Sequence, residues 1–157
     1  MAFPLPLPMR RALDLAAAAA AEGEVPVGAV IARGEEIIAT SANMMLAGND
    51  PTAHAEIVAV RDACRRLGNY QLGGCDVYAS CEPCPMCLGA LYWARPRRVI
   101  YAATRDEAAG AGFDDAFIYR EIGMTHGERK IPFYYAPVDG AVELFRLWRE
   151  KGDRKIY

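Results

Sequence analysis

The side chains with the most evident chemistry in this sequence are thiols, and three of the five cysteines crowd into residues 81–87. Cys84 and Cys87 are three positions apart, so at the first turn of a helix both side chains lie on one face and can bind one metal ion. Pro83 or Pro85 suits the start of that helix, where the helix dipole favours thiolates. This spacing indicates metal chemistry in a reducing compartment rather than a disulfide scaffold.

A third metal ligand has to come from elsewhere, and the chain has only two histidines. His54 lies where a helix is expected to start, and Glu56 follows two residues later. Side chains two apart on a regular helix do not face each other, so His54 must belong to an irregular first turn if both reach one site. Two thiolates and one imidazole leave one tetrahedral position open, which is typical of a catalytic zinc site.

Residues 54–56 and 83–87 together have the H-x-E…P-C-x-x-C pattern of the zinc deaminases. One zinc ion per chain is therefore predicted, with three ligands: His54, Cys84 and Cys87. Zinc in such a site lowers the pKa of a water molecule toward about 7. Glu56 is then expected to carry protons, first as general base and then as general acid, without binding the metal.

Each part of this pattern has a simpler explanation when it is taken alone. A Cys-x-x-Cys pair also fits a structural zinc site or a redox pair, and with Cys81 it fits an iron–sulfur cluster. A single histidine on a helix is more often a packed or surface residue, and Glu56 alone would be a solvated helix charge. In the deaminase interpretation Cys81 is a spare thiol, and Cys64 and Cys75 are small buried residues.

The elements that must position these residues alternate along the chain. Strands are expected at residues 27–31, 36–39, 76–79 and 98–102, and residues 133–135 are expected to be extended. Helices are expected at residues 9–21, 53–67, 85–94, 113–122 and 142–151. Asp50 or Thr52 is expected to cap the second helix, and Gly68 to end it. An opening hairpin followed by alternating helices and strands predicts a layered α/β domain with a mixed sheet of about five strands.

Length and composition limit the alternatives. The 157 residues are expected to form one domain, and 53% hydrophobic with 24% charged residues excludes a disordered or fibrous chain. The net charge of −2 gives no large basic field for nucleic acid or anionic lipid. Asp14 interrupts the alanine-rich stretch near the N-terminus, which is also too short to span a membrane. A cytoplasmic protein that begins with a surface helix is predicted.

The chain resembles the cytidine-deaminase-like zinc hydrolases and, within them, the bacterial guanine deaminases. The likeness runs from about residue 42 to the C-terminus, and it rests on residues 49–56, 80–96, 111–115, 117–119 and 155–157. The H-A-E and P-C-P-M-C segments identify the superfamily, whereas Y-W-A-R-P, G-F-D-D and the terminal tyrosine point to guanine. The resemblance implies a three-layer α/β/α fold and hydrolytic conversion of guanine to xanthine and ammonia.

The resemblance also implies roles for residues around the purine base. Asn43 and the backbone at Ala55 would hold the ring edge, Asp115 would accept hydrogen bonds from the N–H groups of guanine, and Trp93 would help to wall the pocket. Each has a simpler alternative: Asn43 as a turn residue, Asp115 or its neighbour Asp114 as a helix cap, and Trp93 as core packing. Preferring Asp115 to Asp114 rests on motif alignment alone.

The C-terminal segment, about residues 137–157, carries an apolar helix face that needs a surface to cover: Leu144, Phe145, Leu147 and Trp148. In the resembling guanine deaminases this segment crosses to the partner of a homodimer and closes its active site. Here that would bring Tyr157 over the bound base, exclude water and shut out bulky polynucleotides.

Three alternatives stay open. Residues 24–30 resemble the tRNA adenosine deaminases, which share the zinc motif but need a basic surface for a polyanion. The short basic clusters of this chain are interrupted or balanced by acids. A nucleoside or cytosine-type deaminase is the second alternative. The third is a structural zinc-binding module, which would need no Glu56 and would release no ammonia.

Overall fold

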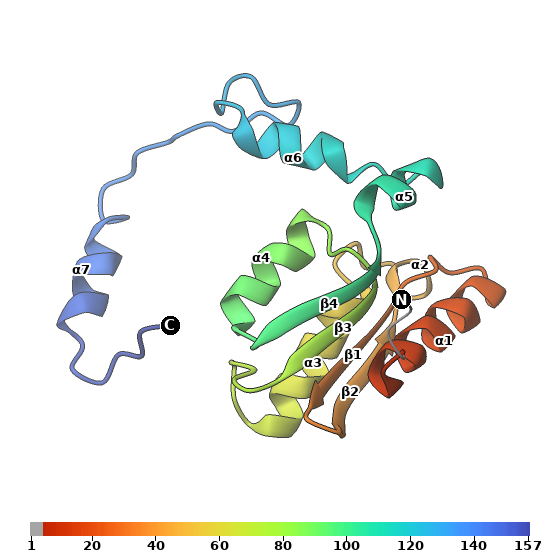
Figure 1. Cartoon of the computed structure of the whole chain (residues 1–157). Helices are drawn as coiled ribbons and strands as arrows, with labels where there is room; N and C mark the ends of the chain where they lie inside the picture. Colours follow the sequence, from red (N-terminus) through yellow and green to blue (C-terminus); the bar gives the residue numbers. More distant parts are fainter. Residues whose placement is uncertain (1–4) are drawn as a thin grey trace. The chain divides into compact units, whose positions relative to one another are not determined.

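The computed structural model describes residues 5–157, and the chain divides into two compact units, Met1–Ala116 and Phe117–Tyr157 (Figure 1). The first unit contains the sheet and all the buried apolar residues of the described chain, which lie between Pro8 and Ala94. No helix in residues 5–157 is long and apolar enough to cross a membrane.

The sheet of the first unit is mixed, as predicted. Its strands are β1 (Gly28–Arg33), β2 (Glu36–Ala42), β3 (Asp76–Cys81) and β4 (Arg98–Ala103), in the order β2-β1-β3-β4. β1 runs antiparallel to both β2 and β3, and β3 runs parallel to β4. The β1–β2 hairpin turns at Gly34, whose φ of 61° is a conformation that glycine adopts without strain.

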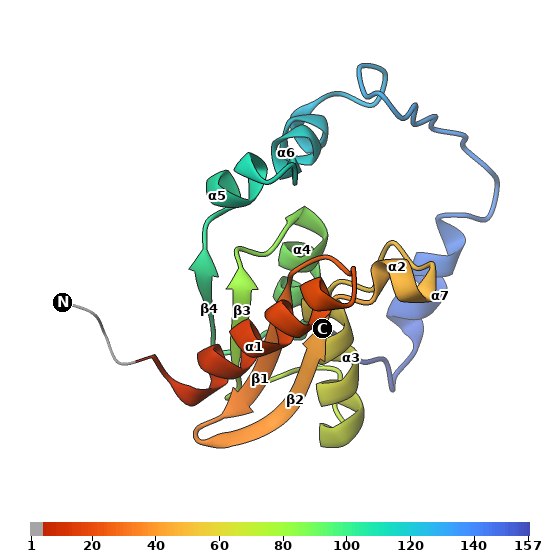
Figure 2. The same cartoon turned by 90° about the vertical axis from the view of Figure 1, so that its right-hand side faces the viewer.

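Helices cover both faces of this sheet. One face packs against α1 (Leu7–Ala21), and the other packs against α3 (Ala55–Leu67) and α4 (Pro85–Ala94) (Figures 1 and 2). Strand side chains alternate between the two layers: Val30 packs with the α1 residues Met9 and Ala12, whereas its neighbour Ile31 packs with the α3 side. The predicted three-layer α/β/α arrangement is confirmed.

The expected number of strands is wrong, because the described chain contains four strands rather than about five. Residues 133–135, which are expected to be extended, have no regular secondary structure and add no further strand. Tyr134 and Tyr135 are 88% and 86% exposed. Aromatic residues favour strands, but a strand forms only where a neighbouring backbone pairs with it and a side-chain face is covered.

The predicted cap of the helix that follows the turn at residues 49–52 is also wrong. This helix, α3, starts at Ala55, with His54 in the N-cap position and no side-chain cap. The Asp50 carboxylate instead accepts hydrogen bonds from the Thr52 backbone N–H at 2.8 Å and from the Thr52 hydroxyl at 2.7 Å. Aspartate often closes a local turn in this way, and here the turn ends before the helix begins.

Four further helices complete the chain. α2 (Met45–Gly48) and α5 (Arg105–Gly110) are short and were not predicted, although Thr104 and Glu107 form a capping box at the start of α5. α6 (Asp115–Gly123) begins in the first unit, and α7 (Glu143–Glu150) lies in the second. No residue of the second unit is buried.

Candidate metal centre and substrate site

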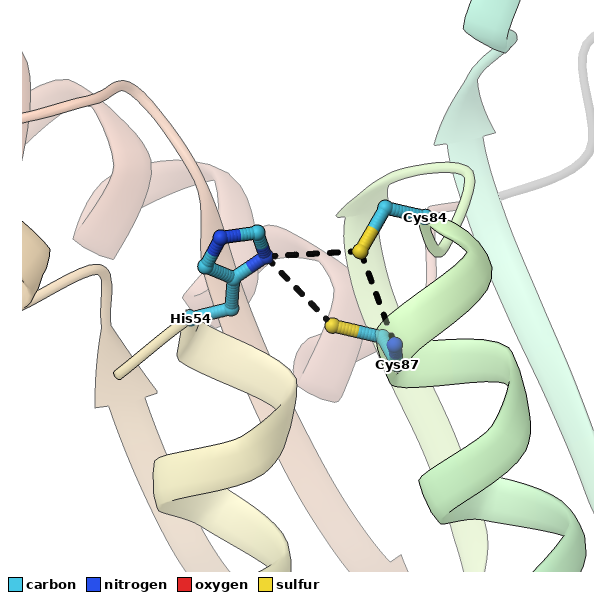
Figure 3. A group of neighbouring side chains, drawn as sticks. All are labelled: His54, Cys84 and Cys87. Atoms are coloured by element: carbon cyan, nitrogen blue, oxygen red, sulfur yellow. Dashed lines mark hydrogen bonds between the residues drawn. The ribbon is translucent and has the colours of Figure 1, made fainter. Parts of the chain in front are cut away.

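The three predicted ligands come together where α3 and α4 begin (Figure 3). His54 immediately precedes α3 with an extended backbone, so it belongs to an irregular helix start, as expected. Cys84 is the N-cap residue of α4, and Cys87 lies in the first turn of that helix. Pro85 begins α4, where a missing backbone N–H costs no hydrogen bond.

The distances among these three side chains fit a tetrahedral metal ion. Nδ1 of His54 lies 3.5 Å from Sγ of Cys84 and 3.6 Å from Sγ of Cys87. All three ligand atoms lie within 4.8 Å of one another. Zn–S bonds of about 2.3 Å and Zn–N bonds of about 2.05 Å, at a tetrahedral angle, require an S···N separation of about 3.6 Å. The side chains therefore suit zinc without rearrangement.

The pKa values of the two thiols also favour a bound cation at this site. Hydrogen bonding to the Cys87 side chain, with further help from His54, lowers the pKa of the Cys84 thiol to about 4. The same hydrogen bond and burial raise the pKa of the Cys87 thiol. Two adjacent thiolates repel each other unless a positive charge lies between them, and a divalent metal ion supplies that charge.

Glu56 is the buried carboxylate beside this centre. It follows Ala55 in the first turn of α3, is 3% exposed, and has one carboxylate oxygen, Oε2, without a hydrogen-bond partner. Burial raises the pKa of Glu56, and the neighbouring Cys84 thiolate adds to this effect. A carboxylate with a raised pKa and an unpartnered oxygen is suited to accept a proton and to return it.

Asp115, at the start of α6, is the second carboxylate near the centre. Burial raises the pKa of Asp115, the charge of Cys84 raises it further, and the charge of His54 lowers it. The carboxylate is therefore close enough to the metal ligands to feel their charges. Cys81 is a neighbour too, since the charges of Glu56 and Asp115 add to the effect of burial in raising the pKa of its thiol. Cys81 is not among the three clustered ligands.

Asn43 is a buried polar residue at the end of β2, only 5% exposed. Its side-chain Oδ1 accepts a hydrogen bond from the Met45 backbone N–H at 2.9 Å, so the proposed turn role is correct. Because the oxygen is used within the protein, the amide NH₂ group is left to donate to a ligand. Ala55, which is fully buried, presents its backbone at the open N-terminus of α3.

The family model for the cytidine and deoxycytidylate deaminase zinc-binding region matches residues 7–103, the segment that holds His54, Glu56, Cys84 and Cys87. The chain belongs to this family. The protein is thus a zinc-dependent hydrolytic deaminase, and the predicted cytidine-deaminase-like fold and zinc cofactor are confirmed.

This deaminase is similar to guanine deaminases and to tRNA-specific adenosine deaminases. A guanine deaminase from Bacillus subtilis (strain 168) is 54% identical over 132 residues, covering 84% of this chain and 85% of the relative. An X-ray structure of guanine deaminase from Bacillus subtilis superposes with a TM-score of 0.92 and 50% identity over 96% of each chain. A tRNA-specific adenosine deaminase from Aquifex aeolicus (strain VF5) is 40% identical over 143 residues, 91% of this chain and 92% of that protein.

Two further predicted substrate contacts of the deaminase are exposed side chains. Trp93 is on α4, six residues after Cys87 and so about 9 Å further along the helix axis. It is 62% exposed, which makes the core-packing explanation wrong. Tyr157 belongs to the second unit and is also 62% exposed. Their contacts with substrate stay predictions.

Two carboxylates that support the deaminase site were missed in the sequence. Glu82 accepts a hydrogen bond from the Arg105 backbone N–H at 2.9 Å, which connects the zinc-binding segment to the start of α5. Glu24 accepts hydrogen bonds from two backbone N–H groups of α2. Both contacts join residues more than 20 positions apart, so no local sequence pattern predicts them.

Proposed function

We propose that this deaminase converts guanine and water to xanthine and ammonia. The observation that carries the proposal is the likeness to guanine deaminase from Bacillus subtilis, which spans 96% of both chains and thus includes the C-terminal part. The segments that pointed to guanine in the sequence lie at residues 92–96, 112–115 and 157, outside the general zinc motif.

The chemistry divides between the metal and one carboxylate. Zinc held by His54, Cys84 and Cys87 would lower the pKa of a water molecule and so make it a nucleophile for the guanine carbon that carries the amino group. Glu56 accepts the proton of the water and delivers it to a ring nitrogen. The same carboxylate then carries the second proton of that water to the amino group, which leaves as ammonia. Its burial, raised pKa and unpartnered Oε2 support this shuttle.

Three groups would orient the base for this step. Asn43 donates its side-chain NH₂ to an acceptor on the purine edge, and the backbone at Ala55 meets the same edge. Asp115 accepts hydrogen bonds from the guanine N–H groups. The electrostatic influence of Cys84 and His54 on Asp115 supports its choice over Asp114. A paired donor and acceptor set of this kind gives strong selection, because a wrong base leaves buried polar groups unpaired.

The C-terminal segment completes this proposal. The protein forms a homodimer in which about residues 137–157 reach the partner, and Tyr157 closes the partner's site over the base. Trp93 contributes to the outer wall of that pocket. The exposed apolar face of α7 supports an intermolecular contact: Leu144 and Phe145 are 67% and 70% exposed.

The protein is expected in the cytoplasm. Its five free cysteines, two of them metal ligands, fit a reducing compartment.

A second candidate function is adenosine deamination in tRNA. It is favoured by the relative from Aquifex aeolicus and by residues 24–30. A polynucleotide substrate requires phosphate contacts, and the chain has a net charge of −2. Guanine deamination accounts better than adenosine deamination in tRNA for the likeness over the whole chain.

One assay separates these candidates. Ammonia release is measured with guanine, guanosine, adenine, cytosine, cytidine and a tRNA, and the Glu56→Gln variant gives the background rate. Guanine should be the preferred substrate, with xanthine as the product. Preferred turnover of the tRNA, with inosine formed, would replace guanine by the second candidate. No ammonia from any substrate would favour the structural zinc module.

A further inference from the structure

The loop between β2 and α3 joins two parts of the site. It starts at Asn43, includes the short helix α2, and ends at His54. Its two ends are held together, because the Met44 N–H donates to the Ala53 carbonyl at 2.9 Å. The backbone N–H of Asn43 donates to the Val27 carbonyl of the sheet layer, also at 2.9 Å. The base-binding amide and a metal-ligating imidazole therefore depend on one loop.

The N-terminus of α2 is capped by two side chains. Oδ1 of Asn43 accepts the hydrogen bond from the Met45 N–H. Oε2 of Glu24 accepts hydrogen bonds from the next two, the Leu46 and Ala47 N–H groups, at 3.0 Å each. Backbone N–H groups in the first turn of a helix have no partner within the helix, so these contacts satisfy donors that would otherwise need water.

Glu24 is itself well anchored. Its backbone N–H donates to the Ala19 carbonyl at 2.9 Å, which fixes it to the end of α1. Its second oxygen, Oε1, accepts a hydrogen bond from the Val25 N–H at 3.0 Å. A carboxylate held at both backbone and side chain can transmit the position of α1 to the loop, because hydrogen bonds to an ionised group are stronger than neutral ones.

We infer that Glu24 is a positioning residue for base recognition: it holds α2 so that Asn43 stays hydrogen-bonded to Met45 and directs its NH₂ group toward the purine edge. This inference rests on the proposed role of Asn43. Glu24 acts through the loop and has no contact with the substrate or the metal. Its removal leaves two N–H groups of α2 without their acceptor and lets the Asn43 side chain turn toward them.

The test is a double-mutant cycle with kinetic and metal readouts. Glu24→Ala should raise the KM for guanine about tenfold and change kcat less than about twofold, because it weakens binding of ground state and transition state alike. Zinc content should stay unchanged. In the Asn43→Ala background, Glu24→Ala should change KM less than about twofold, because the group that it positions is already gone.

A conservative variant separates positioning from loss of stability. In Glu24→Gln the amide oxygen can take the place of Oε2 and still accept from Leu46 and Ala47, whereas the NH₂ group meets the Val25 N–H as a second donor. Its KM should lie between those of the wild type and Glu24→Ala. Glu22→Gln is the matched control, since this neighbouring exposed carboxylate has no bond to α2, and its KM should equal that of the wild type.

Equal effects of Glu24→Ala with and without Asn43 would overturn the inference. So would a lowered melting temperature with an unchanged KM, which would make Glu24 only a stabilising residue. If the wild type prefers another base to guanine, the proposed function fails, and the same cycle on that base decides the role of Glu24. If Glu24→Ala does not fold, the cycle is run with Glu24→Gln, whose effect on KM must again disappear in the Asn43→Ala background.

Discussion

The two units of this deaminase use similar apolar side chains in different ways. In the first unit, Ile31, Leu72 and Val77 are fully buried in a core between sheet and helices. In the second unit, Phe145 and Trp148 are 70% and 46% exposed, and none of residues 117–157 is buried. The first unit therefore supplies its own core, whereas residues 117–157 bury no core of their own.

Chemistry follows the same division. The metal ligands, Glu56 and Asn43 lie in the first unit, on elements fixed by its core. Tyr157 lies in the second. The first unit should therefore determine metal binding, the chemical step and the hydrogen bonds to the base, and the second should determine access to the site.

The largest expected effect comes from removing a metal ligand of the first unit. Cys84→Ser should lose zinc and deaminase activity, because two remaining ligands cannot hold the ion in place of three. Elemental analysis of the purified protein measures the metal, and close to one equivalent per chain is expected for the wild type. Cys81→Ser is the matched control and should keep its zinc, since this thiol lies outside the ligand cluster. Zinc retained in Cys84→Ser, or iron and sulfide in place of zinc, contradicts the assignment.

The next effect concerns the chemical step alone. Glu56→Gln keeps the shape of the side chain but cannot accept a proton, so the rate of guanine turnover should fall by at least about 10²–10⁴-fold. Zinc content and circular dichroism should match the wild type. A near-normal rate would remove Glu56 from the mechanism, and loss of zinc would make it a ligand instead.

A deletion in the second unit tests whether that unit controls access to the site. Removing Ile156 and Tyr157 should leave zinc bound and lower guanine turnover about tenfold or more, because the site then stays open to water. Lys155→Ala, which keeps both residues, serves as the control. Light scattering reports the oligomer in each case. Full guanine activity in the truncation, or an active monomer, would defeat the lid and reopen the tRNA alternative.

The metal centre was predictable because its signal is local and specific. His54 and Glu56 are two residues apart, and Cys84 and Cys87 three apart, so short segments determine the ligands without a model of the fold. The helix that follows Cys84 and contains Cys87 begins and ends as predicted, at Pro85 and Ala94, because proline starts it and Pro96 follows its end.

Three segments were not predicted correctly, each for its own reason. α2 depends on the carboxylate of Glu24, more than 20 residues away, and four residues carry too little periodicity to be recognised. Residues 133–135 add no fifth strand, because aromatic residues favour a strand only where a neighbouring backbone pairs with them. For α5, the Thr104–Glu107 capping box was readable in the sequence and was overlooked.

The smallest expected effect is on the stability of the first unit in acid. Asp76 begins β3, is 4% exposed, and accepts hydrogen bonds from Arg97 at 2.8 and 2.6 Å and from Arg98 at 3.0 Å. These contacts lower the pKa of Asp76 from 3.8 to about 2, and the hydrogen bond with Arg97 contributes most. A depressed carboxyl pKa stabilises the fold above the unfolded value, and this contribution is lost as the pH falls from about 4 toward 2.

Asp76→Asn should therefore lower the free energy of unfolding at neutral pH by about 1–2 kcal/mol, since the arginine partners are themselves largely exposed. Thermal melts of wild type and variant, compared from about pH 7 to about pH 2, should converge at the acid end. Zinc release in acid affects both proteins, so the difference between them isolates Asp76. Asp62→Asn, which removes an exposed ion pair with Arg66, should leave the melting temperature nearly unchanged at every pH. A difference between wild type and Asp76→Asn that persists at about pH 2 would mean that packing, rather than the charge of Asp76, stabilises this end of the sheet.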